Sequence, residues 1–186
     1  MSAYGLPMRC RMVSIVVLCG VDEATQMLLL RRAGSYLHGV WSYVAGHVEA
    51  GEIGWQAALR ELREETALAP EGFWATSFCE QFYRASADAV ELVPAFVARV
   101  ADDALPRLNG EHSAFRWERL DAATELVPFG SQRELLAYLR REFVEREPSP
   151  FLRLAHRELA PRRGAAAVQR GVAAVAGSSR PLAGRR

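Results

Sequence analysis

Residues 54–67 constrain the fold more than any other segment of this chain. Small or apolar residues recur there at the spacing of one helix face: Trp55, Ala58, Leu59, Leu62 and Thr66. This period predicts an amphipathic helix, because it gathers those side chains on one side. Pro70 and Gly72 follow the segment and are expected to end the helix. Other elements of the fold must therefore cover its apolar stripe.

Three glutamates lie on one arc of this predicted helix, beside the apolar stripe. At about 100° per residue, Glu65 lies about 40° to one side of Glu61 and Glu64 about 60° to the other. Like charges at these spacings repel by roughly 0.2–0.5 kcal/mol per pair. A cation such as Mg²⁺ removes that repulsion, because it binds carboxylate oxygens and keeps waters for exchange. For these three residues alone, an exposed acidic face is the alternative.

Strand-length apolar runs flank the predicted helix, at residues 12–18, 27–32, 41–45, 73–83, 90–100 and 114–117. Pro94 favours an edge strand or a bulge in its run, because proline donates no hydrogen bond to a ladder. Ser131 and Glu134 form a capping-box pattern that predicts a helix to about residue 145. Asp121 is expected to cap a short helix before it. Strands interspersed with helices indicate the α/β or α+β class.

Charge divides the chain into two parts. The 23 basic residues, all arginine, nearly balance 22 acidic ones, which argues against a nucleic-acid-binding protein with a strongly basic body. Residues 148–186 carry a net charge of +7 and residues 1–147 a net charge of −6. We therefore expect one folded domain over 1–147 and a mostly disordered, solvated tail over 148–186, rich in Arg, Ala, Gly and Pro.

Cysteine usage and hydropathy bear on the compartment. Cys10, Cys19 and Cys79 show no paired spacing, so a reducing, cytoplasmic environment is expected. No apolar run reaches the roughly 18–20 residues of a membrane span, so no membrane partner is expected. Residues 9–18 have the charge and hydropathy of a signal peptide. No small-residue cleavage site follows, and a buried strand is the preferred interpretation.

A longer pattern surrounds the three glutamates. The chain fits G-x5-E-x7-R-E-U-x-E-E-x-G-U, where U is a large aliphatic residue, with Gly46, Glu52, Arg60, Glu61, Leu62, Glu64, Glu65 and Leu68. At roughly 7% abundance per residue type, about 10⁻⁶ chance matches are expected. Ala67 alone departs from the pattern, at a glycine position; it either costs about 1 kcal/mol as a left-handed residue or extends the helix.

This segment resembles the signature box of the Nudix hydrolases. The resemblance implies a mixed β-sheet between α-helices, and hydrolysis of a nucleoside diphosphate linked to another group, with Mg²⁺ or Mn²⁺ as cofactor. It makes Glu61 and Glu65 metal ligands and Glu64 a further ligand or a water-orienting group, with the Ala45 and Gly46 backbone close to the metal. It also makes Glu52 an outer ligand and Arg60 the residue that holds the glutamates in place.

Residues 110–117 resemble the E-H-x-A-[YF]-[KR]-W stretch of dihydroneopterin triphosphate pyrophosphatases and their dATP-hydrolysing relatives. That likeness implies that Glu111 is a further metal ligand, or the base that takes the proton of the attacking water. An ordinary loop acid is the alternative. His112 is expected to be a hydrogen-bonding loop residue, because Mg²⁺ prefers oxygen ligands.

Three residues outside these motifs are candidates for substrate contact. Arg31 matches a family arginine that meets phosphates, and its fork of donors suits them, although a surface salt bridge is the alternative. Ser131 matches a substrate-contacting serine, although its capping box already accounts for it. Tyr36 lies in a loop, where it is free to stack on a base or pterin.

These features predict Mg²⁺-dependent cleavage of a nucleoside or pterin triphosphate into the monophosphate and pyrophosphate. Hydrolysis of a dinucleoside polyphosphate, ADP-ribose, a nucleotide sugar or an oxidised nucleotide stays open, since the box is common to all these enzymes. A non-catalytic nucleotide-binding regulator is disfavoured, because every box glutamate is present. The expected partner is a small nucleotide or pterin phosphate, and a homodimer is expected from the resemblance alone.

Overall fold

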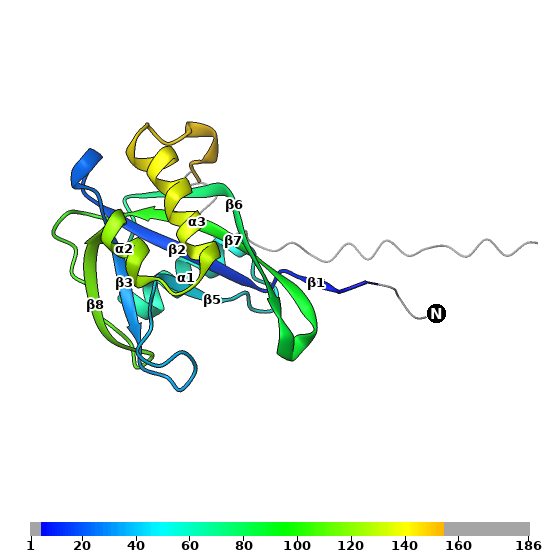
Figure 1. Cartoon of the computed structure of the whole chain (residues 1–186). Helices are drawn as coiled ribbons and strands as arrows, with labels where there is room; N and C mark the ends of the chain where they lie inside the picture. Colours follow the sequence, from blue (N-terminus) through cyan, green and yellow to red (C-terminus); the bar gives the residue numbers. More distant parts are fainter. Residues whose placement is uncertain (1–4, 155–186) are drawn as a thin grey trace, which may run out of the picture.

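A forked, mixed β-sheet with helices on both faces organises the chain (Figure 1), which a computed structural model describes over residues 5–154. The strands are β1 (Met8–Arg9), β2 (Met12–Cys19), β3 (Gln26–Arg32), β4 (Trp41–Ser42), β5 (Val44–His47), β6 (Gly72–Arg84), β7 (Ala89–Arg99) and β8 (His112–Arg119). The α-helices are α1 (Gly54–Thr66), α2 (Leu120–Leu126) and α3 (Gly130–Leu139). Shorter helical turns are η1 (Asp22–Ala24), η2 (Ala85–Ala87), η3 (Arg140–Val144) and η4 (Pro150–Leu152).

The sheet forks along β2. The strand runs parallel to β7 on one side. On the other side its first half pairs with β5 and its last two residues pair with β3. β3 in turn pairs with β4 and β8, while β7 also pairs with β6 and β1. The fork brings β5 alongside α1, which places the end of that strand next to the acidic helix.

Strand alternation divides the core into two layers. On β2, Val13, Ile15 and Val17 pack on the face that α1 covers. Val16 and Leu18 pack on the opposite face, under α2 and α3. Both faces of β2 are therefore buried, which explains its nearly continuous apolar sequence. The expected fold class, a mixed sheet between helices, is confirmed.

Two expectations for the strands need correction. The run at 41–45 is not one strand, because β4 pairs with β3 whereas β5 pairs with β2. The edge alternative for Pro94 is wrong, since β7 has neighbours on both sides. Pro94 lies opposite Cys79, where the β6–β7 register shifts after Ala75, so the missing proline N–H falls at an irregular part of the ladder.

The expected helix caps are wrong. Phe129 is the N-cap of α3, and its N–H donates to the Oε1 of Gln132 at 3.4 Å. Gln132 therefore reaches back to the cap, and Ser131 is the second residue of the helix rather than its N-cap. Asp121 is likewise inside the first turn of α2, where Arg119 is the N-cap.

Contacts with the sheet continue past residue 147. The N–H of Leu154 donates to the carbonyl of Phe73 at 2.9 Å, and Arg153 forms a bridge with Trp74. The Arg153 guanidinium also lies 5.4 Å from the centre of the Trp74 ring. Residues 150–154 thus pack on β6, while the rest of the predicted tail lies outside the described residues.

Candidate active site

The end of β5 approaches α1 so closely that only glycine fits at position 46. A Cβ on Gly46 would lie 1.9 Å from the Cδ of Glu61 and 2.0 Å from its Oε1. Real Cβ atoms do not come that near another heavy atom, so any side chain here must displace Glu61. The glycine of the signature box therefore has a steric reason in this chain.

Arg60 holds the acidic residues of the box in one network. Its guanidinium donates to both carboxylate oxygens of Glu52, at 3.0 and 3.1 Å. It also donates to Glu61 at 2.9 Å, to Glu64 at 3.1 Å and to the carbonyl of His47 at 2.8 Å. The ion pair lowers the pKa of Glu52. Both oxygens of Glu52 accept hydrogen bonds from Arg60, so Glu52 supports Arg60 rather than pointing a free oxygen at the other glutamates.

Glu65 is the most buried carboxylate of the helix, with 3% of its surface exposed. Burial raises its pKa to about 8, and the negative charges of Glu61 and Glu111 add to the shift. Arg32 and a backbone hydrogen bond from Ala45 oppose it. Its Oε2 has no hydrogen-bond partner among the described residues. A buried carboxylate oxygen without a donor calls for a proton or a cation.

The residues around that oxygen suit a hard divalent cation. Glu61, Glu65 and Glu111 supply carboxylate oxygens, which Mg²⁺ and Mn²⁺ prefer. As placed, no three acidic, histidine or cysteine side chains of residues 5–154 are gathered closely enough to ligate one ion together. The network of Arg60 accounts for this, since it engages one oxygen each of Glu61 and Glu64. Metal binding would therefore compete with Arg60 for those two carboxylates.

Glu111 lies in the turn that leads into β8. Its carbonyl accepts a hydrogen bond from Ala33 at 2.8 Å, and its N–H donates to the Oδ1 of Asn109 at 3.0 Å. These backbone bonds fix the turn, while the side chain stays exposed and acts on Glu65 through its charge. The structure thus brings Glu111 to the glutamates of α1 from a segment more than forty residues away.

His112 is not the loop residue that was expected. It is the first residue of β8 and is buried, with its Nε2 3.7 Å from the Oε2 of Glu65. Burial and the charge of Arg32 lower its pKa, so the imidazole is neutral near pH 7. Its Nδ1 has no partner among the described residues. Strand pairing with β3, invisible in a local pattern, carries it inward.

The three candidate substrate contacts are not brought to the glutamates. Arg31 lies opposite Trp41 of β4 in the strand ladder, on the sheet face that α2 and α3 cover. Tyr36 is 74% exposed in the loop after β3. Ser131 donates to Glu80 at 3.4 Å. The arginine whose charge reaches Glu65 is Arg32. The alternation of β3, with Leu28 and Leu30 facing α1, was the signal that would have placed it there.

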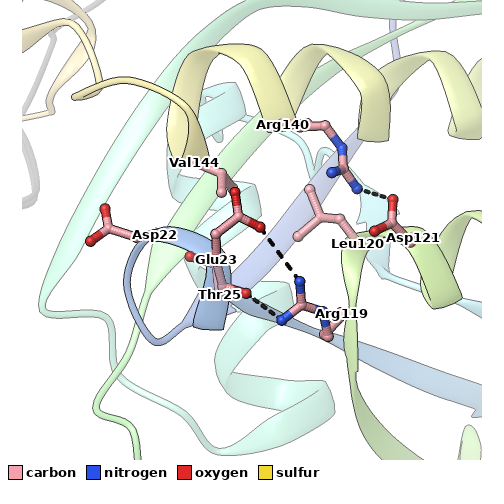
Figure 2. Close-up of a pocket in the computed structure, with 8 residues that line it drawn as sticks. All are labelled: Asp22, Glu23, Thr25, Arg119, Leu120, Asp121, Arg140 and Val144. Atoms are coloured by element: carbon pink, nitrogen blue, oxygen red, sulfur yellow. Dashed lines mark hydrogen bonds and ion pairs between the residues drawn. The ribbon is translucent and has the colours of Figure 1, made fainter.

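A separate pocket lies near the start of α2, where two ion pairs line it (Figure 2). Arg119 pairs with Glu23 and Arg140 pairs with Asp121, so each arginine already has a carboxylate partner. The pocket has a volume of about 20 Å³, room for one water beside the buried hydroxyl of Thr25. It offers neither the space nor the free charge that a nucleotide needs.

Comparisons with known proteins agree with this fold. The family model described as NUDIX domain matches residues 8–143. An octanoyltransferase from Myxococcus xanthus is 36% identical over 135 residues, covering 69% of this chain and only 36% of that protein. The asymmetrical bis(5'-nucleosyl)-tetraphosphatase of Sus scrofa is 34% identical over 118 residues, covering 62% of this chain and 80% of that protein.

Among solved structures, the dihydroneopterin triphosphate pyrophosphohydrolase of E. coli superposes with a TM-score of 0.57 at 25% identity. The match covers 68% of this chain and 92% of that one. The chain belongs to the Nudix family, since the family model matches more than half of it. In the part of the chain that the structure describes, no helix is long and apolar enough to cross a membrane.

Proposed function

We propose that this protein cleaves a nucleoside or pterin triphosphate into the monophosphate and pyrophosphate, with Mg²⁺ or Mn²⁺ as cofactor. The observation that carries the proposal is the buried Oε2 of Glu65, which has no hydrogen-bond partner among the described residues. It lies on the same helix as Glu61, whose carboxyl approaches the Gly46 backbone. The likeness of residues 110–117 to dihydroneopterin triphosphate pyrophosphatases and the E. coli structure support the triphosphate substrate.

The box residues divide into ligands and supports. Glu61, Glu64 and Glu65 would hold the cation, with the Ala45 backbone beside them. Arg60 would position the glutamates, and Glu52 would hold Arg60 in turn. When bound, the cation neutralises the diphosphate and lowers the pKa of the attacking water.

Glu111 is proposed as a further ligand or as the base of the reaction. In the second role its carboxylate accepts a proton from the water that attacks phosphorus. The bond between that phosphorus and the bridging oxygen breaks, and pyrophosphate leaves. Exposure suits Glu111 to this role, since a base must exchange its proton with solvent after each turnover.

Substrate contacts outside the box are proposed in two groups. Arg32 is better placed than Arg31 to meet phosphates near Glu65, because its charge already acts on that carboxylate. Arg31, Tyr36 and Ser131 would contact the part of the substrate that lies beyond the phosphates. A guanidinium keeps its charge at every working pH, which suits either arginine to an anionic ligand.

A second candidate activity is hydrolysis of a dinucleoside polyphosphate. It is favoured by the 34% identity to the tetraphosphatase of Sus scrofa, which covers most of that enzyme. Hydrolysis of ADP-ribose, a nucleotide sugar or an oxidised nucleotide would use the same box. A non-catalytic nucleotide-binding regulator is disfavoured, because every glutamate of the box is present.

Product analysis separates these activities. The full chain would be incubated with Mg²⁺ and, in turn, dATP, the other nucleoside triphosphates, dihydroneopterin triphosphate, a dinucleoside tetraphosphate and ADP-ribose. Pyrophosphate and the monophosphate from one triphosphate, at a kcat/KM far above the rest, is the expected result. Nucleotide products without pyrophosphate, from the dinucleotide or ADP-ribose, would keep the family chemistry and replace the substrate. Binding without turnover across the panel would favour the regulator.

The proposal extends to the cellular location and the oligomeric state of the protein. The three cysteines are free thiols in the structure, which supports a reducing, cytoplasmic location. A homodimer stays a prediction from the family resemblance, to be checked by light scattering of the purified chain.

A further inference from the structure

A buried histidine faces the glutamates of α1, and the proposed reaction gives it no role. His112 follows the turn of Glu111 and opens β8. Its side chain is 3% exposed, and that of Glu65 is 4% exposed. The Nε2 of His112 lies 3.7 Å from the Oε2 of Glu65. This separation is longer than a hydrogen bond, and a small rotation of either side chain closes it.

Both side chains of this contact contain a buried polar atom without a hydrogen bond. The Oε2 of Glu65 and the Nδ1 of His112 have no partner among the described residues. A carboxylate only accepts hydrogen bonds, whereas an imidazole carries an N–H on Nε2 in one neutral tautomer and in the imidazolium. A bond from Nε2 to Oε2 is therefore available in either protonation state, and it satisfies the carboxylate oxygen.

Strand pairing places the imidazole where it can make this bond. His112 lies opposite Arg32 at the end of the β3–β8 ladder. The residue before it, Glu111, accepts a backbone hydrogen bond from Ala33 at 2.8 Å. One short segment therefore joins two acidic parts of the site, because its backbone holds the turn of Glu111 and its imidazole faces Glu65.

Glu65 has few other groups to orient it. The network of Arg60 engages the other acidic residues of the box, and Glu65 is not part of it. A backbone hydrogen bond from Ala45 reaches the carboxyl, yet Oε2 stays without a partner. Arg32 acts on Glu65 through its charge. Among the described residues, His112 is the only basic side chain that forms an ion-pair contact with this carboxylate.

We propose that His112 is a positioning residue of the metal site, whose Nε2–H donates to the Oε2 of Glu65 and fixes the orientation of that carboxylate. This inference rests on the proposed function, since it concerns the ligands of the same site. A nitrogen that donates to a carboxylate has no lone pair for a metal, so His112 acts through Glu65. Loss of such a partner typically weakens metal binding by about 10–100-fold.

Equilibrium binding of Mn²⁺ to the full chain without substrate tests the inference apart from turnover, with the free ion measured by electron paramagnetic resonance. His112→Phe keeps an aromatic ring and removes both nitrogens, so the Kd for Mn²⁺ should rise by about tenfold or more. His112→Gln carries its amide nitrogen near the place of Nε2 and should keep the Kd within about threefold. His112→Asn carries its amide near the place of Nδ1 and should bind as weakly as His112→Phe.

Thr25→Val is the matched control for the loss of a buried polar group. The Thr25 hydroxyl is buried and has no partner among the described residues. Thr25 precedes β3, at the opposite end of that strand from Arg32. Its variant should bind Mn²⁺ as the unmodified chain does. The Tm of each variant would be measured alongside, and His112→Gln against His112→Asn decides the question even where His112→Phe fails to fold.

A Kd in folded His112→Phe within about twofold of the unmodified chain would overturn the inference. Equal affinities in His112→Gln and His112→Asn would overturn it as well, and so would an unmodified chain that binds no Mn²⁺. Binding that depends on His112 in a chain that releases no pyrophosphate would overturn the proposed reaction and leave the positioning role standing. Pyrophosphate release by a chain whose Mn²⁺ affinity is independent of His112 would do the reverse.

Discussion

The Gly46 backbone and the Glu61 carboxyl occupy adjoining space, with 1.9 Å between the Glu61 Cδ and the point where a Cβ on residue 46 would lie. The close approach ties the end of β5 to the middle of α1. It allows backbone groups of the strand and carboxylates of the helix to face one centre.

Gly46→Ala tests this relationship. The new methyl group must push the Glu61 side chain away, so kcat should fall by about a hundredfold or more while the chain still folds. Gly34→Ala is the matched control, because a Cβ there meets nothing within 4 Å. Steady-state rates and circular dichroism of both variants would be compared. Full activity in Gly46→Ala would show that Glu61 need not lie where the structure has it.

Stability of the metal-free protein should depend on Glu65. Its pKa rises from 4.5 to about 8 in the fold, so the folded state holds a proton that the unfolded state releases. The contribution of Glu65 to the free energy of unfolding is then fully present below about pH 4.5. It is lost as the pH rises through about 8, by an amount on the order of a few kcal/mol.

Urea unfolding in EDTA between pH 5 and 9 measures this loss, and Glu65→Gln should flatten the profile. Because a cation binds the ionised carboxylate, the stabilisation by Mg²⁺ should grow over the same pH range. A variant profile as steep as that of the unmodified chain would assign the pH dependence to another group.

Ala67 offers a stability test that is independent of the chemistry. It ends α1 in the left-handed conformation, at φ 56°, so the strained alternative considered for this position is the one found. Ala67→Gly should therefore stabilise the chain by roughly 0.5–1 kcal/mol. Ala137→Gly, inside α3 and exposed, should destabilise it by a similar amount. If the two substitutions changed the free energy of unfolding in the same direction relative to the unmodified chain, the account would be contradicted.

The packing of residues 150–154 predicts different results for two truncations. Ending the chain after Leu154 should keep kcat/KM within a few-fold, since the described domain is intact. Ending it after Pro148 removes the hydrogen bond from Leu154 to Phe73 and the Arg153–Trp74 contact, and should lower the Tm. A large loss of activity in the longer product would assign substrate binding to residues 155–186.

Local patterns predicted a good part of this molecule. The helix at 54–66 and the runs that became β2, β3, β6 and β7 followed from periodicity, because each element's burial repeats along its own sequence. The resemblance of the box named a set of acidic residues, and the structure places three of them, Glu52, Glu61 and Glu64, around Arg60.

The remaining features depend on contacts between distant segments. Gln132, not Ser131, satisfies the cap of α3, and a capping-box pattern cannot show which residue reaches back. Pairing of β3 with β8 buries His112, and the face of β3 decides that Arg32 rather than Arg31 acts on Glu65.

Pyrophosphate release by the unmodified chain and by Glu65→Gln, each with increasing Mg²⁺ and then with EDTA, tests the central claim most directly. The change is nearly isosteric, and Glu71→Gln at an exposed turn controls for the lost charge. The account predicts Mg²⁺-dependent turnover that EDTA abolishes, a kcat lower by at least a hundredfold in Glu65→Gln, and normal rates in Glu71→Gln. Near-normal turnover in Glu65→Gln, or release that persists in EDTA, would contradict the assignment of the α1 glutamates as the metal site.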